Sequence, residues 1–187
     1  RPVHINLLIF ALRMIDKTVV ISQNICDEVE RAIDGISPDK VFVLYDSTTH
    51  ECCSPLLEGC RSLQNATAIQ IPATDVNKTL DTLSAVWMEL SNGGASRRSL
   101  LINVGGGMVT DLGGFAASTF KRGIAYINIP TTLLAMVDAS VGGKTAINFN
   151  GLKNEVGVFN RCMGRHNEFR HGPCRLRGFA ENGCRQY

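Results

Sequence analysis

The stretch LLINVGGGMVTDLGGFAA, residues 100–117, decides the fold of this chain. Its first five residues are apolar except for Asn103, which is typical of a short strand buried inside a parallel sheet. Gly105, Gly106 and Gly107 follow, and we expect a helix to begin around Val109. A strand, a glycine turn and a helix in this order predict an α/β fold with a parallel sheet.

The same alternation extends outward from this stretch, starting at Ile15. Short apolar runs rich in β-branched residues predict buried strands, at residues 18–22, 41–45, 67–71, 100–104 and 124–129. Helical patterns lie between them, at residues 26–33, 55–63 and 78–90. In the last helix, apolar residues recur at helical spacing and should face the core: Leu80, Leu83, Val86, Trp87 and Leu90.

The bulk composition favours one globular domain. The chain has 187 residues, of which 44% are hydrophobic and 19% charged, enough to bury a sizeable core. Its formal net charge of +2 lacks the basic excess that nucleic acids and anionic membranes attract. We therefore expect neither a nucleic acid nor a membrane as a partner.

The N-terminus and the cysteines add two expectations. The apolar run at residues 5–12 is too short to span a bilayer and lacks a signal-peptide cleavage motif. We expect residues 1–13 to be a non-native or upstream leader, with Met14 as the natural start. The seven cysteines are odd in number and contain no C-x-x-C pair, so we interpret them as reduced thiols of a cytoplasmic protein.

The three glycines predict a binding site for a phosphate or pyrophosphate. Free backbone N–H groups of a glycine turn and the dipole of the following helix both favour an anion, and a dinucleotide would suit such a site. The spacing departs from the G-x-G-x-x-G fingerprint, because Thr110 occupies the third glycine position. The plain alternative is that the glycines only form a tight turn.

Two further segments carry polar groups suited to the same ligand. Lys144 lies in a Gly-Lys-Thr sequence that is like the end of a P-loop, but Asp138 stands where the first P-loop glycine would be. Lys144 is either a charge for a phosphate or a solvated lysine. Thr131 and Thr132 follow a predicted strand, where one could simply cap a helix. Because ligands of open α/β sheets bind at the carboxyl ends of the strands, these threonines and the glycine turn could line one crevice.

An ordered series of motifs resembles the 3-dehydroquinate synthase family over roughly residues 15–160. The motifs are GGGMVTDLGGFAA at 105–117, FKRG at 120–123, PTTLLAMVDASVGGKT at 130–145 and NGLKN at 150–154. The resemblance implies a Rossmann-like parallel-sheet domain at residues 14–160 that binds NAD. It also implies a phosphate-eliminating lyase that converts 3-deoxy-D-arabino-heptulosonate 7-phosphate to 3-dehydroquinate and phosphate, with NAD and a divalent metal, zinc or cobalt, as cofactors.

The resemblance assigns cofactor roles residue by residue. It places Asp46 near the adenine ribose, and it puts the family's acid-x-x-lysine pair on Asp75 and Lys78, where glutamate is more usual at the first position. Further matches are the pyrophosphate-binding turn and hydroxyls that contact the cofactor, namely Gly106, Gly107, Asp111, Thr131 and Thr132.

The remaining matches concern the sugar-phosphate substrate. Asp138, Lys144, Lys153 and Asn154 match residues that hold substrate or cofactor in the cleft between two domains, with Lys144 expected to meet the departing phosphate. Arg122 matches an arginine that reaches the substrate of a neighbouring subunit, which implies a homodimer.

The last segment departs from the family pattern. Glu181, in Gly-Phe-Ala-Glu, fits the family motif for one of three metal ligands, but no histidine follows it, and one carboxylate cannot hold a catalytic metal. We expect residues 161–187 to be an aberrant tail in place of the start of the helical metal-binding domain, and the chain to be inactive alone. The alternative is a new metal site at Cys162, His166, His171 and Cys174, whose spacing matches no standard finger.

Three other functions stay open: a related sugar-phosphate cyclase, a polyol dehydrogenase of the same superfamily, or a non-catalytic NAD-binding remnant. The cationic motifs around Arg122 and Lys144 argue against a polyol dehydrogenase, because a substrate without phosphate needs no such cluster.

Overall fold

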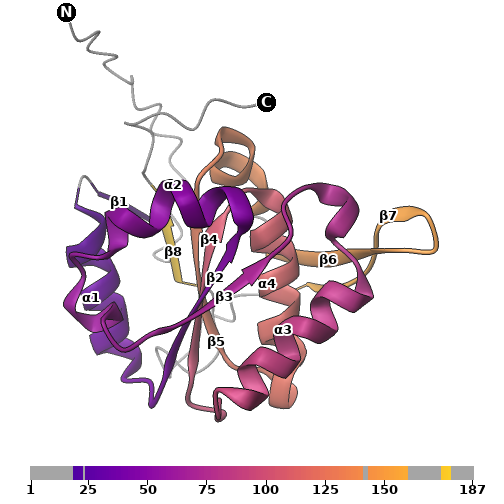
Figure 1. Ribbon diagram of the computed structural model, residues 1–187. Coiled ribbons are helices and arrows are strands. Elements are labelled where there is room, and N and C mark those ends of the chain that lie inside the picture. The colour runs from indigo at the N-terminus through magenta and orange to yellow at the C-terminus, as the bar shows by residue number, and fades with distance from the viewer. Residues whose placement is uncertain (1–18, 23, 141–142, 160–173, 178–187) are drawn as a thin grey trace, which may run out of the picture.

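A six-stranded parallel sheet forms the centre of the computed structural model, which describes residues 19–22, 24–140, 143–159 and 174–177. The strand order is β1-β8-β5-β4-β2-β3, and every strand pairing in this sheet is parallel (Figure 1). The strand bounds are β1 Val19–Ile21, β2 Val41–Asp46, β3 Thr67–Ile71, β4 Leu100–Gly105, β5 Ala125–Pro130 and β8 Cys174–Arg177. The five strands predicted from sequence are confirmed to within two residues at each end. Strand β8 was not predicted, because its sequence has no periodic apolar pattern; its backbone pairs with β1 and β5.

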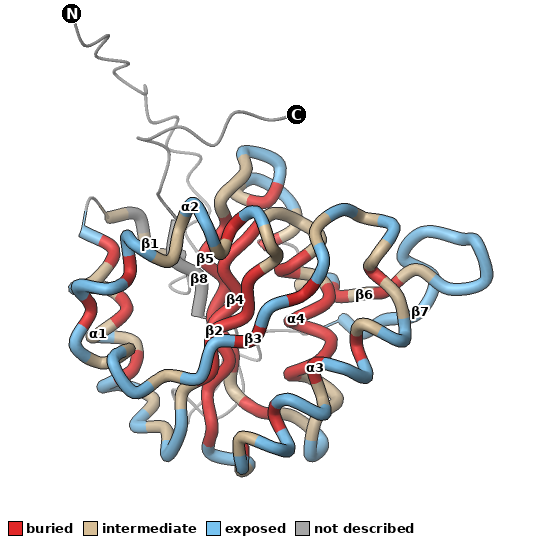
Figure 2. The backbone as a smooth tube through the Cα atoms, viewed as in Figure 1, coloured by how far each residue is buried: buried red, intermediate tan, exposed pale blue. Residues whose placement is uncertain are grey.

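Helices cover both faces of the sheet. Helix α1 (Ile25–Ile36) lies on one face, whereas α3 (Leu80–Asn92) and α4 (Gly107–Thr119) lie on the other (Figure 1). Alternating residues of β2 serve the two cores: Phe42 and Leu44 pack with α3 and α4, while Val43 and Tyr45 pack with α1. Buried positions therefore run through the sheet and along the inner sides of the helices (Figure 2). The predicted α/β architecture is confirmed.

The helix expected at residues 55–63 is wrong. Helix α2 instead covers Ser47–Leu57, with Pro55 inside it, and Arg61–Leu63 form only the short 3₁₀ turn η1. The cause is a capping box directly after β2: Asp46 Oδ1 accepts from Thr49 N at 2.7 Å, and Thr49 Oγ1 accepts from Asp46 N at 3.0 Å.

The predicted core face of α3 is confirmed except at its first residue. Leu83, Val86 and Leu90 are fully buried, and Trp87 is partly buried against the same core. Leu80 is 47% exposed, because it occupies the first turn, next to the cap residue Thr79.

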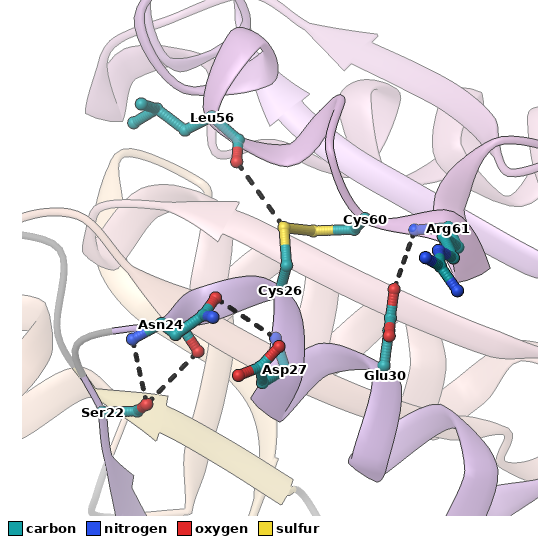
Figure 3. The surroundings of a disulfide bond; sticks show 8 residues. All are labelled: Ser22, Asn24, Cys26, Asp27, Glu30, Leu56, Cys60 and Arg61. Atoms are coloured by element: carbon teal, nitrogen blue, oxygen red, sulfur yellow. Dashed lines mark hydrogen bonds between the residues drawn. A yellow bond between two sulfur atoms is a disulfide. The ribbon is translucent and has the colours of Figure 1, made fainter.

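The interpretation of all cysteines as reduced thiols is also wrong. Cys26 of α1 and Cys60, just after α2, form a disulfide across a sequence separation of 34 residues (Figure 3). Arg61 N donates to Glu30 Oε1 at 2.9 Å between the same two segments. The fold brings the two Cα atoms to 4.9 Å, within the usual range for a disulfide. Cys52 and Cys53 are not in a disulfide.

A buried amide pair links β4 to β5. Asn103 Nδ2 donates to Asn128 Oδ1 at 2.8 Å, and the two residues are direct partners in the strand register. The same register pairs Gly105 with Pro130, at the carboxyl ends of the two strands.

A β-hairpin completes the described part of the chain. Strands β6 (Lys144–Phe149) and β7 (Leu152–Phe159) pair antiparallel in a sheet of their own. Ile147 anchors β6 in the core shared with α3 and α4, whereas β7 is exposed along its whole length (Figure 2). Among the described residues, no helix is long and apolar enough to cross a membrane.

Candidate functional site

The glycine turn and the threonines after β5 lie in contact. Thr131 N donates to Gly105 O at 3.0 Å, and a Cβ built on Gly106 would lie 3.1 Å from Thr132 Cγ2. The glycine turn and these threonines therefore lie side by side at the carboxyl ends of β4 and β5, where the crevice was predicted. Thr132 Oγ1 also accepts from Ala135 N at 3.3 Å, at the start of the π-helical turn η4 (Ala135–Ala139). This contact is compatible with a capping role as well as with a ligand-binding one.

The turn has the features of an anion site. Gly106 is the N-cap of α4 and, having no side chain, makes no side-chain capping hydrogen bond to the amides at the helix start. Helix α4 begins at Gly107, two residues earlier than predicted, so its N-terminal dipole starts inside the glycine turn. A side chain at position 106 would fill space between the turn and Thr132. These residues fit a bound phosphate or pyrophosphate.

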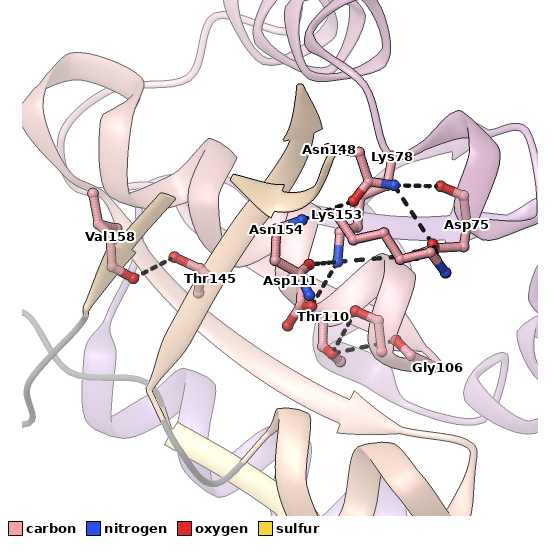
Figure 4. A network of polar contacts seen from close by, with 11 residues as sticks. Asp75, Lys78, Gly106, Thr110, Asp111, Thr145, Asn148, Lys153, Asn154 and Val158 are labelled. Carbon is pink, nitrogen blue, oxygen red and sulfur yellow. Dashed lines mark hydrogen bonds and ion pairs between the residues drawn. The ribbon is translucent and has the colours of Figure 1, made fainter. Parts of the chain in front are cut away.

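A buried lysine forms the centre of a polar cluster beside this turn (Figure 4). Lys78 is 3% exposed, and its Nζ lies 2.8 Å from Asp111 Oδ2, in the first turns of α4. Lys78 Nζ also donates to Asn154 Oδ1 of β7 and lies 4.0 Å from Asp75 Oδ1. Three segments far apart in sequence thus converge on one ammonium group: the 3₁₀ turn η2 (Asp75–Asn77), α4 and the hairpin.

The two carboxylates of the cluster have opposite pKa shifts. Burial raises the pKa of Asp111, with added repulsion from Asp138 and Asp75, although Lys78 acts in the other direction. The hydrogen bond from Lys153, whose Nζ is 2.9 Å from Asp75 Oδ2, lowers the pKa of Asp75. Asp111 is the enclosed carboxylate, and Asp75 is the partly exposed one.

Three further predicted site residues lie outside this cluster. Asp46 ends β2 and caps α2. Asp138 is exposed on η4 and close enough to Asp111 for charge repulsion. Lys144 is exposed at the start of β6, directly after Gly143 in a left-handed conformation with φ of 66°.

Arg122 is not brought to this site. It is exposed in the 3₁₀ turn η3 (Phe120–Arg122), ahead of β5, and therefore at the amino end of that strand. Strand β5 has six residues, which separates the two edges by roughly 20 Å.

Sequence reasoning missed Asn148, the next-to-last residue of β6. Its Oδ1 accepts from Asn154 N at 3.0 Å, and its Nδ2 donates to Asp75 O at 2.9 Å. The sequence carries one weak signal for it, its position two residues before the N-G-L-K-N motif.

The metal prediction rests on residues that the structure does not describe. Glu181 lies outside the described residues, as do Cys162, His166 and His171 of the alternative site; the side chain of Cys174 is likewise not described. Within the described ranges, no group of three or more His, Cys, Asp or Glu residues could hold a metal ion.

Comparison with known proteins gives consistent matches. The model of the family described as 3-dehydroquinate synthase N-terminal matches residues 68–166. A 3-dehydroquinate synthase from Parabacteroides distasonis is 54% identical over 146 residues, which cover 78% of this chain and 41% of that relative. The chain thus spans less than half the length of this curated relative.

Two solved structures have the same fold and about one quarter of their aligned residues identical to this chain. A 2-deoxy-scyllo-inosose synthase superposes with a TM-score of 0.71 and 26% identity, over 84% of this chain and 42% of that one. A 2-epi-5-epi-valiolone synthase from Streptomyces hygroscopicus subsp. jinggangensis, solved with NAD+ and Zn2+ bound, has a TM-score of 0.67 and 27% identity, over 84% of this chain and 41% of that one.

Proposed function

Because the chain belongs to the 3-dehydroquinate synthase family, we propose that residues 14–160 are the NAD-binding part of an enzyme that makes 3-dehydroquinate and phosphate from 3-deoxy-D-arabino-heptulosonate 7-phosphate. The proposed enzyme is a phosphate-eliminating lyase. The observation that carries the proposal is the convergence of the Gly105–Gly107 turn, Thr131, Thr132 and the Lys78 cluster at one edge of the sheet.

The turn is proposed to bind the pyrophosphate of NAD. Backbone amides of Gly106 and Gly107 would donate to its oxygens, supported by the dipole of α4. Asp46 would accept from the adenine ribose with the oxygen that Thr49 N does not use. When bound, NAD would supply the acceptor for a hydride from a ring carbon of the substrate that bears a hydroxyl.

Lys78 and Asp111 are proposed to fix the geometry around the cofactor. The Lys78 ammonium is desolvated and held between Asp111 and Asn154, so it keeps one position without the freedom of a surface lysine. Asp75 would stand where the family more often has glutamate, and its partner Lys153 would turn from it toward the ligand.

The cationic groups at the rim suit a sugar phosphate. Lys144 and Lys153 are both exposed at the hairpin, so each can reach a phosphate without breaking a buried contact. Asp138 and Asn154 would contact the sugar hydroxyls, with Asn154 Oδ1 already oriented by Lys78. We propose that Lys144 meets the departing phosphate.

A metal and a second subunit complete the proposal. The Zn2+ bound by the valiolone synthase supports a divalent metal for the same kind of chemistry. The described residues do not provide its ligands, so no step is assigned to it here. Arg122, at the opposite edge of the sheet, would serve the site of a neighbouring subunit in a homodimer.

Calorimetry of NAD binding to the purified chain tests the cofactor assignment. We expect saturable binding that is lost in Gly106→Val, whose side chain would fill the turn beside Thr132, and weakened in Asp111→Asn. Gly59→Val is the matched control, because a Cβ at Gly59 meets nothing within 4 Å. A wild-type chain that is folded by circular dichroism and binds no NAD would rule the assignment out.

A further inference from the structure

The β6–β7 hairpin contains an irregularity at the place where it reaches the site. Ile147 pairs with Val156, but Phe149 pairs with Leu152. One residue of β6, Asn148, therefore stands opposite three residues of β7, which are 153–155. Such a bulge re-aims the side chains it contains. Two of the three, Lys153 and Asn154, are proposed ligand-binding residues.

The bulge contains a residue in the left-handed conformation. Asn154 has a φ of 55°, in the region that Asn adopts more readily than most other residues apart from glycine. Its backbone N–H points to Asn148 Oδ1 at 3.0 Å, a hydrogen bond that a regular ladder would not provide. The Asn148 amide thus takes the place of a strand partner for the bulged residue.

The other end of the same amide fixes the segment that carries Asp75 and Lys78. Asn148 Nδ2 donates to Asp75 O at 2.9 Å and lies 3.5 Å from Asp75 Oδ2. The backbone N–H of Asn148 donates to Lys78 O at 2.7 Å. One residue therefore contacts Asp75, Lys78 and Asn154, across sequence separations of up to 73 residues (Figure 4).

We propose that Asn148 is a positioning residue that locks the bulge carrying Lys153 and Asn154 onto the Asp75–Lys78 segment, so that these side chains meet the ligand together. This inference rests on the proposed function for its ligand, but the geometry it describes exists without one. Asn148 acts through its neighbours and needs no contact with NAD or substrate itself.

Two variants separate the two ends of the amide. Asn148→Leu removes both hydrogen bonds at similar volume. Asn148→Asp keeps an acceptor for Asn154 N but loses the donor to Asp75 O and adds a charge beside the Asp75 carboxylate. The matched control is Asn150→Gly in the same hairpin, since Asn150 also has a positive φ, of 50°, which glycine adopts without cost.

Two readouts are measured on the full chain: hydrogen exchange of the Asn154 amide, and the Kd for NAD by calorimetry, with the thermal midpoint recorded for each variant. We expect Asn148→Leu to speed the exchange and raise the Kd by about tenfold each, as loss of a partnered amide should. Asn148→Asp should restore slow exchange but not the affinity, and Asn150→Gly should match wild type in both. If Asn148 only stabilised the fold, both Asn148 variants would lower the thermal midpoint, and Asn148→Asp would not combine slow exchange with weak NAD binding.

The inference is overturned if Asn148→Leu leaves exchange and Kd at the values of Asn150→Gly. If Asn148→Leu does not fold, Asn148→Asp decides by itself, because wild-type affinity in that variant would contradict the proposal. If the wild-type chain binds no NAD, the proposed function fails, and the exchange comparison alone decides whether Asn148 holds the bulge.

Discussion

The glycine turn and the β6–β7 hairpin meet at one site, but they are held in place by opposite means. The turn is fixed by close packing: a Cβ at Gly105 would lie 2.5 Å from Val109, and one at Gly113, further along α4, would lie 2.0 Å from Asn103 Oδ1. The hairpin is exposed along β7, and its site residues are fixed by hydrogen bonds from Lys78 and Asn148.

This difference predicts how each region responds to substitution. The anion site proposed at the glycine turn consists of backbone amides, whose positions depend on the packing around them. Substitutions in this region should therefore lower the stability of the fold more than they change specific ligand contacts. A site made of side chains on an exposed hairpin should lose binding while the fold survives. Single substitutions in each region test this division.

Gly113→Ala should cause the greatest loss of stability. The added methyl group would overlap Asn103 Oδ1 at 2.0 Å and Leu44 Cδ2 at 2.8 Å, inside a buried helix–sheet contact. We expect a loss of about 3 kcal/mol in the free energy of unfolding, measured with denaturant. Gly59→Ala, in open space, should be neutral. Equal stability of the two variants would mean that packing does not hold the turn region.

Lys78→Met should affect both regions, because Lys78 joins them. Removing the ammonium leaves Asp111 without its cation 2.8 Å away, and the pKa of Asp111, already raised by burial, should rise further. We expect a loss of about 2 kcal/mol and of NAD binding, after allowing for the partial exposure of Asp111. Adding Asp111→Leu should recover stability but not binding. A double variant no more stable than Lys78→Met would contradict this account.

Tyr45→Phe should change only the alkaline limit of stability. Burial raises the pKa of Tyr45 to about 12, from an ordinary value of 10.0, with a smaller effect of Cys53. The unfolded chain therefore loses this proton first, and Tyr45 makes stability fall as pH rises between those values. The slope is at most about 1.4 kcal/mol per pH unit. Denaturant midpoints from pH 9 to 12 should fall less in Tyr45→Phe, and parallel curves would exclude Tyr45 as the cause.

Lys153→Met should leave the fold almost unchanged. Its side chain is 78% exposed, and exposed ion pairs contribute little. In wild type, the Lys153 hydrogen bond lowers the pKa of Asp75, so the stability from this carboxylate is present above its usual pKa of 3.8 and is lost as pH falls through the lowered value. Carbon NMR titration should show the Asp75 pKa nearer its usual value in the variant, while NAD or phosphate binding weakens. An unchanged Asp75 pKa would show that the contact is absent in solution.

Much of the fold could be predicted from local sequence signals. β-Branched runs marked the strands, and the glycines after β4 marked the turn and α4. The convergence of the turn with Thr131 and Thr132 followed because parallel strands end at the same edge. The roles proposed for these residues remain predictions.

The features that were missed depend on contacts distant in sequence or on competing local signals. A helix was expected from residue 55, but α2 begins eight residues earlier, at Ser47, where Asp46 and Thr49 form a capping box. The Cys26–Cys60 disulfide depends on how α1 packs beside the end of α2. Asn148 looks like an ordinary polar strand residue until the hairpin folds back on Asp75.

The Asn103–Asn128 pair in the middle of the sheet favours one alignment of β5 along β4 over its neighbours. If β5 slid by one residue along β4, its side chains would exchange faces, and both amides would be buried unpaired at a cost of roughly 1–3 kcal/mol each. The native alignment is also the one in which Thr131 N donates to Gly105 O in the glycine turn. The amide pair therefore helps to set the geometry of the site from about two residues further inside the sheet, and it does so without a ligand.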